Sequence, residues 1–196
     1  MCLYFNFFGI MEIYVIRHTK VARKDICYGQ INVPLADSFL EEVAQFKNEL
    51  PTDFEAIFCS PLLRCKNLAE ELHFDNIIFE NALMEINFGE WEGQTWNEID
   101  QDKLNIWMQD FANEKPPQGE NLLELFERVS LFLEKCRKMS HKKILLITHS
   151  GVIRCIWAYL LEIPLQNIFK IPVGHQEIFA FNLTSQKQTD SIKQTK

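Results

Sequence analysis

Several common sequence features are missing from this chain of 196 residues. None of its six cysteines belongs to a Cys-x-x-Cys pair, and several lie inside apolar runs, where a reduced thiol behaves as a small hydrophobic group. We therefore expect a cytoplasmic protein rather than a secreted disulfide scaffold. No segment reaches the roughly 20 consecutive apolar residues that span a bilayer, so we expect no membrane partner.

An excess of positive charge is also missing. The chain has 20 lysine and arginine residues against 27 aspartate and glutamate residues, which gives a formal net charge of −7. Because its average surface repels a nucleic-acid backbone, we expect no nucleic-acid partner. An anionic ligand must then bind in a local basic pocket. The hydrophobic share of 47% and the charged share of 24% are ordinary for a globular protein, and the length suits one domain.

The two ends of the chain differ from its middle. Residues 1–10 are mostly apolar but lack the basic start and small-residue cleavage site of a signal peptide. We expect an upstream extension there, with an added edge strand as the alternative. Residues 184–196 are polar and have little to bury, so we expect them to be disordered. Residues 11–183 form the expected domain.

Strand and helix patterns alternate along this domain. Short β-branched and aromatic runs predict strands, and apolar residues at helical spacing predict helices. The expected strands are 12–16, 56–59, 77–80, 143–148 and 177–183. The expected helices start near Asp37 or Ser38, at Ser60-Pro61, within 96–111, near Glu120 and at Ser150. This alternation predicts an α/β fold, a single three-layer domain with a mostly parallel central sheet and helices on both faces.

Basic side chains follow the ends of the expected strands. Arg17 and His18 come directly after the first strand, and His149 follows the strand 143–148. Arg64 lies in the first turn of the helix that follows the strand 56–59. In α/β sheets of this kind, ligands bind beyond the carboxyl ends of the strands. The four side chains are therefore expected to converge on one crevice.

The segment Ile16-Arg17-His18-Thr19 resembles the Arg-His motif of the histidine phosphatase superfamily, also called the phosphoglycerate mutase-like family. Further blocks resemble the family's remaining motifs in the same order: Ser60-Pro61-Leu62 with Arg64, Leu83-Met84-Glu85 with residues 88–93, Gly119-Glu120, and Thr148-His149-Ser150-Gly151. The resemblance spans residues 12 to about 183. It implies a metal-independent phosphoric monoester hydrolase that needs no cofactor and whose ligand is a small-molecule phosphate monoester.

The resemblance also implies a role for each residue, and the chemistry of phosphoryl transfer agrees with it. Neutral His18 would attack phosphorus and form a phosphohistidine, which water then hydrolyses. Arg17 and Arg64 offer planar forks to phosphate oxygens, and His149 would add a charged donor if the phosphate dianion protonates it. Glu85 is the candidate general acid for the leaving alkoxide.

The sequence departs from the family beside the nucleophile. Thr19 stands where many relatives have glycine, and Asn32 stands where aspartate often precedes the Val-Pro-Leu segment. An asparagine that often contacts phosphate in the first loop of relatives has no clear counterpart between Lys20 and Tyr28. Thr19 can still donate a hydroxyl or a backbone N–H, and we count Thr19 and Gln30 among the candidate substrate-binding residues.

Within the superfamily, Tyr28-Gly29-Gln30, Val33-Pro34-Leu35 and residues 85–93 look like the α-ribazole phosphatases. These enzymes remove the 5′-phosphate of α-ribazole phosphate in assembling the nucleotide loop of cobalamin. A broad-specificity histidine phosphatase and a phosphoglycerate mutase-like enzyme are the alternatives, although the short first loop disfavours a mutase. A non-catalytic phospholigand-binding module would have no use for Glu85. A homodimer stays open as the assembly.

Each candidate residue also has a structural interpretation. An arginine at a strand end is more often a surface cation, His149 could be a core or capping residue, and acidic residues are common around Glu85. Among the other histidines, only His175 is a candidate for the pocket. No group of histidine, cysteine or carboxylate residues has the spacing of metal ligands, so we expect no metal site. The aromatic residues Trp96, Trp107 and Phe111 suit core or lid packing better than a cofactor site.

Overall fold

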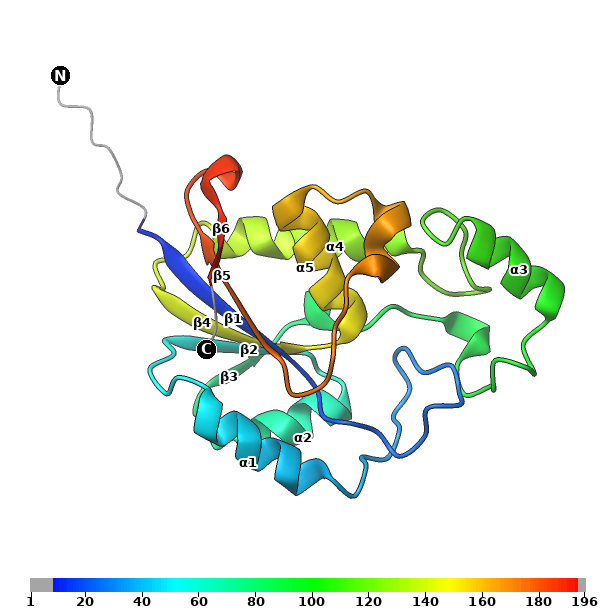
Figure 1. Cartoon of the computed structure of the whole chain (residues 1–196), viewed down its shortest axis with the longest axis horizontal. Coiled ribbons are helices and arrows are strands. Elements are labelled where there is room, and N and C mark those ends of the chain that lie inside the picture. Colours follow the sequence, from blue (N-terminus) through cyan, green and yellow to red (C-terminus); the bar gives the residue numbers. More distant parts are fainter. Residues whose placement is uncertain (1–8, 194–196) are drawn as a thin grey trace.

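The computed structural model describes residues 9–193, which form one six-stranded sheet in the order β3-β2-β4-β1-β5-β6 (Figure 1). The strands are β1 (Met11–Arg17), β2 (Ala56–Cys59), β3 (Ile77–Phe79), β4 (Lys143–Thr148), β5 (Ile178–Leu183) and β6 (Ser191–Lys193). Strands β3, β2, β4 and β1 are parallel, whereas β5 and β6 pair in the antiparallel sense. The expected mostly parallel sheet is therefore confirmed. The expected extension at 1–10 falls largely on residues 1–8, which lie outside the described residues.

The two faces of the sheet are covered by different helices. Helices α1 (Phe39–Glu49) and α2 (Leu63–Glu71) pack on one face, and α4 (Leu122–Cys136) and α5 (Ser150–Leu161) pack on the other (Figure 1). Helix α3 (Gln101–Gln109) lies beyond the sheet, on the side to which the strands' carboxyl ends point. This arrangement confirms the expected three layers. None of the helices within residues 9–193 combines the length and the apolar character needed to cross a membrane.

The side chains of the central strands point alternately to the two faces of the sheet, and this divides the core in two. Ile13 and Val15 of β1 pack against the α4 and α5 side, whereas Tyr14 and Ile16 pack against the α1 and α2 side. Successive side chains of a strand point to opposite faces, so a strand covered on both sides is apolar throughout. This is why the sequence shows continuous apolar runs at β1 and β4.

Helix α2 begins later than the sequence indicated. We expected Ser60 as its N-cap and Pro61 as its first residue, but the helix begins at Leu63. The Ser60 hydroxyl still accepts a weak bond of 3.4 Å from the Leu62 N–H, and it lies 2.7 Å from His149 Nε2. The Ser60 hydroxyl, which we expected to cap helix α2, therefore binds His149, 89 residues away in the sequence.

The expected disorder of the tail is wrong for residues 184–193. Strand β6 pairs with β5 at the sheet edge, and the short helix η4 (Lys187–Thr189) precedes it. The carboxylate of Asp190 accepts two hydrogen bonds from Arg137, the C-cap residue of α4, at 2.8 and 2.9 Å, and a third from the Thr184 N–H. A polar tail therefore gains order from backbone pairing and a buried ion pair, without apolar burial of its own.

Candidate active site

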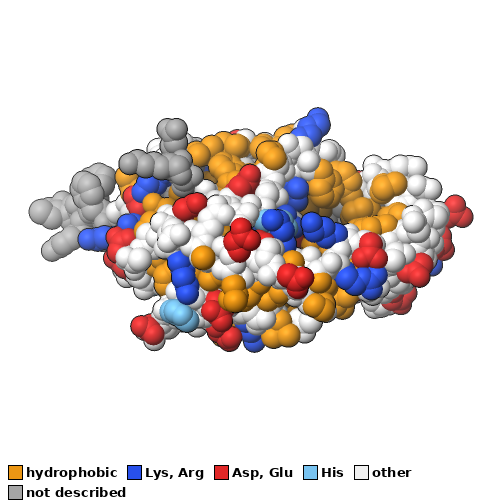
Figure 2. Space-filling view, turned by 60° about the horizontal axis from the view of Figure 1, so that its bottom comes forward, with side chains coloured by type: hydrophobic (Ala, Val, Ile, Leu, Met, Phe, Trp, Pro, Cys, Tyr) orange, Lys and Arg blue, Asp and Glu red, His pale blue; other side chains and the backbone are white. Residues whose placement is uncertain are grey.

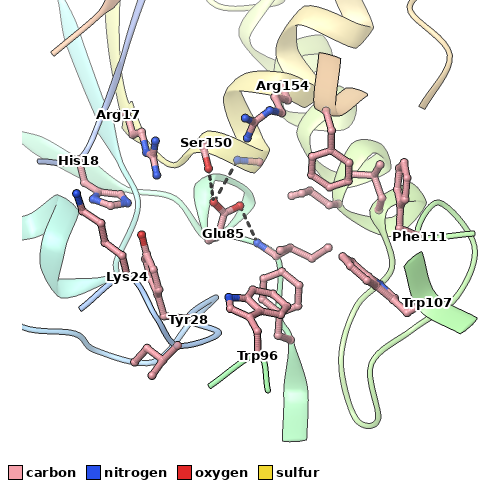
Figure 3. A pocket seen from close by; sticks show the side chains of 17 residues that line it. Arg17, His18, Lys24, Tyr28, Glu85, Trp96, Trp107, Phe111, Ser150 and Arg154 are labelled. Carbon is pink, nitrogen blue, oxygen red and sulfur yellow. Dashed lines mark hydrogen bonds between the residues drawn. The ribbon is translucent and has the colours of Figure 1, made fainter. Parts of the chain in front are cut away.

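A cavity of about 200 Å³ opens at the carboxyl ends of β1 and β4. Figure 2 shows basic side chains and a histidine gathered near the middle of one face, beside a group of hydrophobic side chains. The polar end of the cavity is lined by Arg17, His18, Lys24, Tyr28, Glu85, Ser150 and Arg154. Its apolar end is lined by Ile86, Phe88, Trp96, Trp107, Phe111, Leu122, Leu125 and Phe169. One cavity thus joins a charged compartment to an aromatic one (Figure 3).

His18 follows β1 directly and is buried, with 1% of its surface exposed. Its Nδ1 lies 2.7 Å from the backbone carbonyl of Thr19. A carbonyl oxygen can only accept, so Nδ1 carries the hydrogen and Nε2 keeps its lone pair. Burial, followed by the charges of Arg64 and Arg17, holds the pKa of His18 well below its ordinary value. The ring is therefore neutral at pH 7, as a nucleophile must be.

Glu85 reaches the cavity at the N-terminus of α5. Its carboxylate accepts hydrogen bonds from the Ile86 N–H at 3.0 Å, the Ser150 hydroxyl at 3.3 Å and the Gly151 N–H at 3.1 Å (Figure 3). The N-terminus of a helix attracts negative charge, which strengthens this placement. The backbone carbonyl of Glu85 is held as well, by Arg128 of α4 at 3.2 Å. The segment that carries the candidate acid is thus fixed from two sides.

Arg64 and His149 form a buried pair next to the cavity. The Nε–H of Arg64 donates to His149 Nδ1 at 3.2 Å, so Nδ1 has no hydrogen and Nε2–H donates to the Ser60 hydroxyl. The pKa of His149 lies well below its ordinary value because the ring is buried and Arg64 is adjacent. The ring centres of His149 and His18 are 5.1 Å apart. His149 is therefore neutral in this arrangement, and the charged form that we expected would require the bond from Arg64 to break.

The guanidinium of Arg64 is also bound by the first loop. It donates to the carbonyls of Gly29 and Ile31, and neither Arg64 nor His149 lines the cavity wall. The loop is held in turn by Glu92, whose carboxylate accepts from the N–H groups of Gln30 at 2.8 Å and Ile31 at 2.6 Å. Glu92 lies in one of the family-like blocks, but the sequence did not indicate this organising role. Arg64 keeps two of its five N–H groups for other acceptors.

The chain after the 3₁₀-helix η3 (Leu165–Lys170) approaches the nucleophile from the other side. The carbonyl of Val173 accepts a hydrogen bond from Arg17 at 3.1 Å, and His175 Nδ1–H donates to the His18 carbonyl at 3.0 Å. The His175 and His18 ring centres are 5.7 Å apart. The expectation for His175 is thus met in part, because it contacts the nucleophile's backbone without lining the cavity.

Comparison with known proteins gives a match between residues 13–191 and the model of the histidine phosphatase superfamily (branch 1). The chain belongs to the histidine phosphatase superfamily. An adenosylcobalamin/α-ribazole phosphatase of Escherichia coli K12 is 25% identical over 173 residues, which covers 83% of this chain and 85% of that protein. A protein of E. coli O1:K1 named "Probable phosphoglycerate mutase GpmB" is 27% identical over 168 residues, which covers 79% of this chain and 77% of that protein.

Solved structures of the superfamily share the fold. The α-ribazole phosphatase of Shigella flexneri superposes with a TM-score of 0.86 at 22% identity, and the match covers 94% of this chain and 96% of that one. At this identity the likeness shows the fold alone. It supports the sheet order and the layers described above.

Two candidate substrate-binding residues of this histidine phosphatase do not line the cavity. Thr19 is fully buried, and its hydroxyl has no hydrogen-bond partner among the described residues. The side-chain amide of Gln30 donates to the backbone carbonyl of Glu85 at 3.0 Å. The structure therefore brings Arg17, His18 and Glu85 together on the cavity wall, with Arg64 and His149 against His18. Thr19 and Gln30 instead support the residues that face the cavity.

Sequence reasoning missed two further cations that line the cavity, Lys24 and Arg154. The signal for Arg154 was its position four residues after Ser150, which places both on one face of α5. Trp107 of α3 packs edge-on against Trp91, and its ring centre lies 6.2 Å from that of Phe111. These aromatic residues therefore pack against one another, and Trp107 and Phe111 also line the cavity. Within residues 9–193, no group of three or more histidine, cysteine, aspartate or glutamate residues is arranged to hold a metal ion.

Proposed function

We propose that this chain is a phosphomonoesterase that works through a phosphohistidine at His18 and acts on α-ribazole 5′-phosphate. The observation that carries the proposal is the bond from His18 Nδ1–H to the Thr19 carbonyl, which leaves Nε2 as an unprotonated nucleophile. Arg17 and the carboxylate of Glu85 line the same cavity. A nucleophile, a cation and an acid therefore surround one site, as phosphoryl transfer requires.

The proposed reaction has two displacements. In the first, His18 Nε2 forms a bond to phosphorus while the bond from phosphorus to the ester oxygen breaks, and Glu85 donates a proton to that oxygen. In the second, water attacks phosphorus, the nitrogen–phosphorus bond breaks, and the Glu85 carboxylate takes the proton of the water. The products are the alcohol and inorganic phosphate. Arg17 stabilises the charge on the phosphoryl oxygens, and Arg64 adds its positive electrostatic field from behind the cavity wall.

The choice of substrate rests on the aromatic end of the cavity. Phe88, Trp96, Trp107, Phe111 and Phe169 line the end away from His18. Such rings stack favourably on a flat heteroaromatic base, whereas apart from the indole N–H groups of Trp96 and Trp107 they offer no hydrogen-bond donor or acceptor to a short polar alcohol. The names of the E. coli and S. flexneri relatives agree with this choice.

Two alternatives fit the same catalytic groups. A phosphoglycerate mutase-like activity is suggested by the name of the second E. coli relative, but the aromatic end of the cavity does not complement the carboxylate of phosphoglycerate. A broad-specificity phosphatase would use the aromatic end for many esters. A module that only binds phospholigands would not need Glu85 in the cavity beside His18.

The proposal extends to the protein's surroundings. Cys27, Cys59, Cys65, Cys136 and Cys155 are free and buried, which suits a reducing compartment, and we propose the cytoplasm. The overall charge of −7 favours a small anionic ester over nucleic acid as the ligand. A homodimer is compatible with the proposal, and the mass in solution tests it.

The experiment compares initial rates on α-ribazole 5′-phosphate, 3-phosphoglycerate and p-nitrophenyl phosphate, each with and without EDTA. We expect the highest kcat/KM for α-ribazole 5′-phosphate and no effect of EDTA, with the His18→Ala variant as the inactive control. A preference for 3-phosphoglycerate that depends on a bisphosphate cofactor would establish the mutase instead. Equal rates on all esters would establish a broad-specificity phosphatase, and activity restored by Mg²⁺ or Zn²⁺ after EDTA would refute metal independence.

A further inference from the structure

Arg154 is a cation in the wall of the cavity that the reaction steps above leave without a role. It lies one turn into α5, four residues after Ser150, so its side chain emerges on the face that carries Ser150. Its Nε–H donates to the carbonyl of Ile171 at 3.0 Å, and its guanidinium lies 5.8 Å from the centre of the Phe169 ring. Two neighbouring segments thus fix the position of this side chain.

The terminal nitrogens of Arg154 have no acceptor within the described part of the chain. Among the described residues, only its Nε–H forms a hydrogen bond, although the residue is half-buried. Within residues 9–193, neither terminal nitrogen is among the buried atoms that lack a partner, so both keep accessible surface on a side chain that lines the cavity. A guanidinium carries four N–H bonds on these two nitrogens. Four donors therefore lack an acceptor among the described residues, on a side chain that lines the cavity (Figure 3).

Arg154 occupies a different place in the cavity from Arg17. Figure 3 shows Arg17 on the His18 side of Glu85 and Arg154 on the side of the aromatic residues. In the proposed reaction, phosphorus lies next to His18 and the ester oxygen next to Glu85. The group that follows the ester oxygen must then pass Arg154 before an aromatic ring reaches Phe169 or Phe111, whose own rings are 4.7 Å apart.

We propose that Arg154 is a specificity-determining residue that donates hydrogen bonds to the sugar oxygens of the alcohol part of the substrate. The inference rests on the proposed phosphatase function, which it deepens. A sugar between phosphate and base presents hydroxyl and ring oxygens at the level of Arg154. A substrate without these oxygens leaves the four donors unpaired inside a partly desolvated cavity, which weakens its binding.

The experiment compares two aromatic esters that differ in the sugar, α-ribazole 5′-phosphate and benzyl phosphate, in the wild type, Arg154→Met and Arg154→Lys. Methionine keeps an unbranched apolar stem but removes every donor. We expect Arg154→Met to lower kcat/KM for α-ribazole 5′-phosphate by about 10- to 100-fold and for benzyl phosphate by less than about threefold. Arg154→Lys should recover part of the loss. Inhibition by inorganic phosphate should stay unchanged, whereas Arg17→Met should weaken it.

Other outcomes overturn the inference. Equal losses for both esters, together with weaker inhibition by phosphate, would place Arg154 at the phosphate instead. No loss for α-ribazole 5′-phosphate would remove any role in recognition, and a larger loss for 3-phosphoglycerate would assign Arg154 to a carboxylate. Thermal melting of each variant checks the fold.

A further set of measurements distinguishes a wrong substrate assignment from a wrong role for Arg154. If the wild type does not hydrolyse α-ribazole 5′-phosphate, adenosine 5′-monophosphate replaces it as the ester with a sugar and an aromatic base. Dissociation constants are measured as well, in variants that also carry His18→Ala, so that the comparison does not depend on turnover. A sugar-dependent loss of affinity on Arg154→Met supports the inference even if the physiological ester is another one. Equal affinity changes for the two ester types refute it.

Discussion

Glu85 and Gly151 are fitted so closely that a β-carbon at position 151 would force the Glu85 carboxylate to move. The Gly151 N–H donates to the Glu85 carboxylate at 3.1 Å, and a β-carbon on Gly151 would lie 2.2 Å from Glu85 Oε1. Gly151 lies in the first turn of α5 and has no positive φ, so its backbone conformation does not require glycine. The lack of space beside Glu85 does. The helix N-terminus can therefore hold the candidate acid only because residue 151 lacks a β-carbon.

The first prediction follows from this contact. Gly151→Ala should displace the Glu85 carboxylate and lower kcat/KM for α-ribazole 5′-phosphate by at least about 10-fold, because a general acid contributes about 10²- to 10⁴-fold when correctly placed. The overpacking should cost about 1–3 kcal/mol of stability, which thermal melting measures. Gly9→Ala is the matched control, since a β-carbon there meets nothing within 4 Å. Undiminished activity in Gly151→Ala would show that the position of Glu85 is unimportant.

The second prediction separates the two tasks of Glu85. Glu85→Gln should lower kcat/KM strongly for an alkyl ester such as α-ribazole 5′-phosphate, whose oxygen is too basic to leave without a proton. p-Nitrophenyl phosphate should lose less, because its phenolate leaves with little help, and a burst should appear when water activation becomes limiting. Stopped-flow and steady-state rates on both esters measure this. Equal losses without a burst would assign Glu85 a positional role and direct attention to Glu90, Glu92 or Glu120.

The third prediction concerns the covalent intermediate. Brief quenching under non-acidic conditions with phosphate-labelled substrate should leave label on His18, since its Nε2 is the unprotonated nitrogen. His18→Ala should carry no label and show no turnover, while keeping its fold. Peptide mapping locates the labelled residue. Label on a serine or cysteine would contradict the mechanism.

The fourth prediction uses the charge that Arg64 places beside His18. After burial, Arg64 is the largest cause of the low pKa of His18, so the nucleophile stays neutral well below pH 6.5. Removing the positive charge by Arg64→Met makes protonation easier, and the acidic limb of the pH–kcat/KM profile should move to higher pH. Titration of the substrate's own phosphate is identical in both proteins and cancels in the comparison. Arg23→Met, an exposed arginine paired with Asp25, should leave the limb in place; an unmoved limb in Arg64→Met would refute the prediction.

The fifth prediction concerns stability. The pKa values of His18 and His149 are lowered in the folded protein, so below about pH 6.5 the unfolded chain binds protons that the folded chain does not. The free energy of unfolding should therefore fall with decreasing pH, by up to about 1.4 kcal/mol per pH unit for each histidine, until the folded pKa is reached. Denaturant melts between pH 7 and pH 5 measure the slope. His149→Gln should flatten it relative to His73→Asn, an exposed control, and an equal slope in both would contradict the assignment.

Much of the fold was predictable because its central strands are buried on both faces. Ala56–Cys59 and Lys143–Thr148 were predicted with the bounds that the structure has, since a strand covered twice is one continuous apolar run. The start of helix α5 at Ser150 was predicted as well. The tail was not predictable, because the order of β6 comes from pairing with β5 and from the bond between Asp190 and Arg137, which local hydrophobicity does not encode.

The sequence by itself determined which chemical groups are present and which strand ends carry them, because local patterns show where each strand ends along the chain and which motif follows it. Only the tertiary structure decided which of these groups face the cavity. Arg64 is held by the carbonyl of Gly29, 35 residues away, whereas the terminal donors of Arg154 meet no acceptor among residues 9–193. The direction of a long side chain depends on acceptors supplied by distant segments, and those meet only when the sheet and its loops are assembled. The same physical reason separates Arg17, His18 and Glu85 on the cavity wall from Arg64 and His149 behind it.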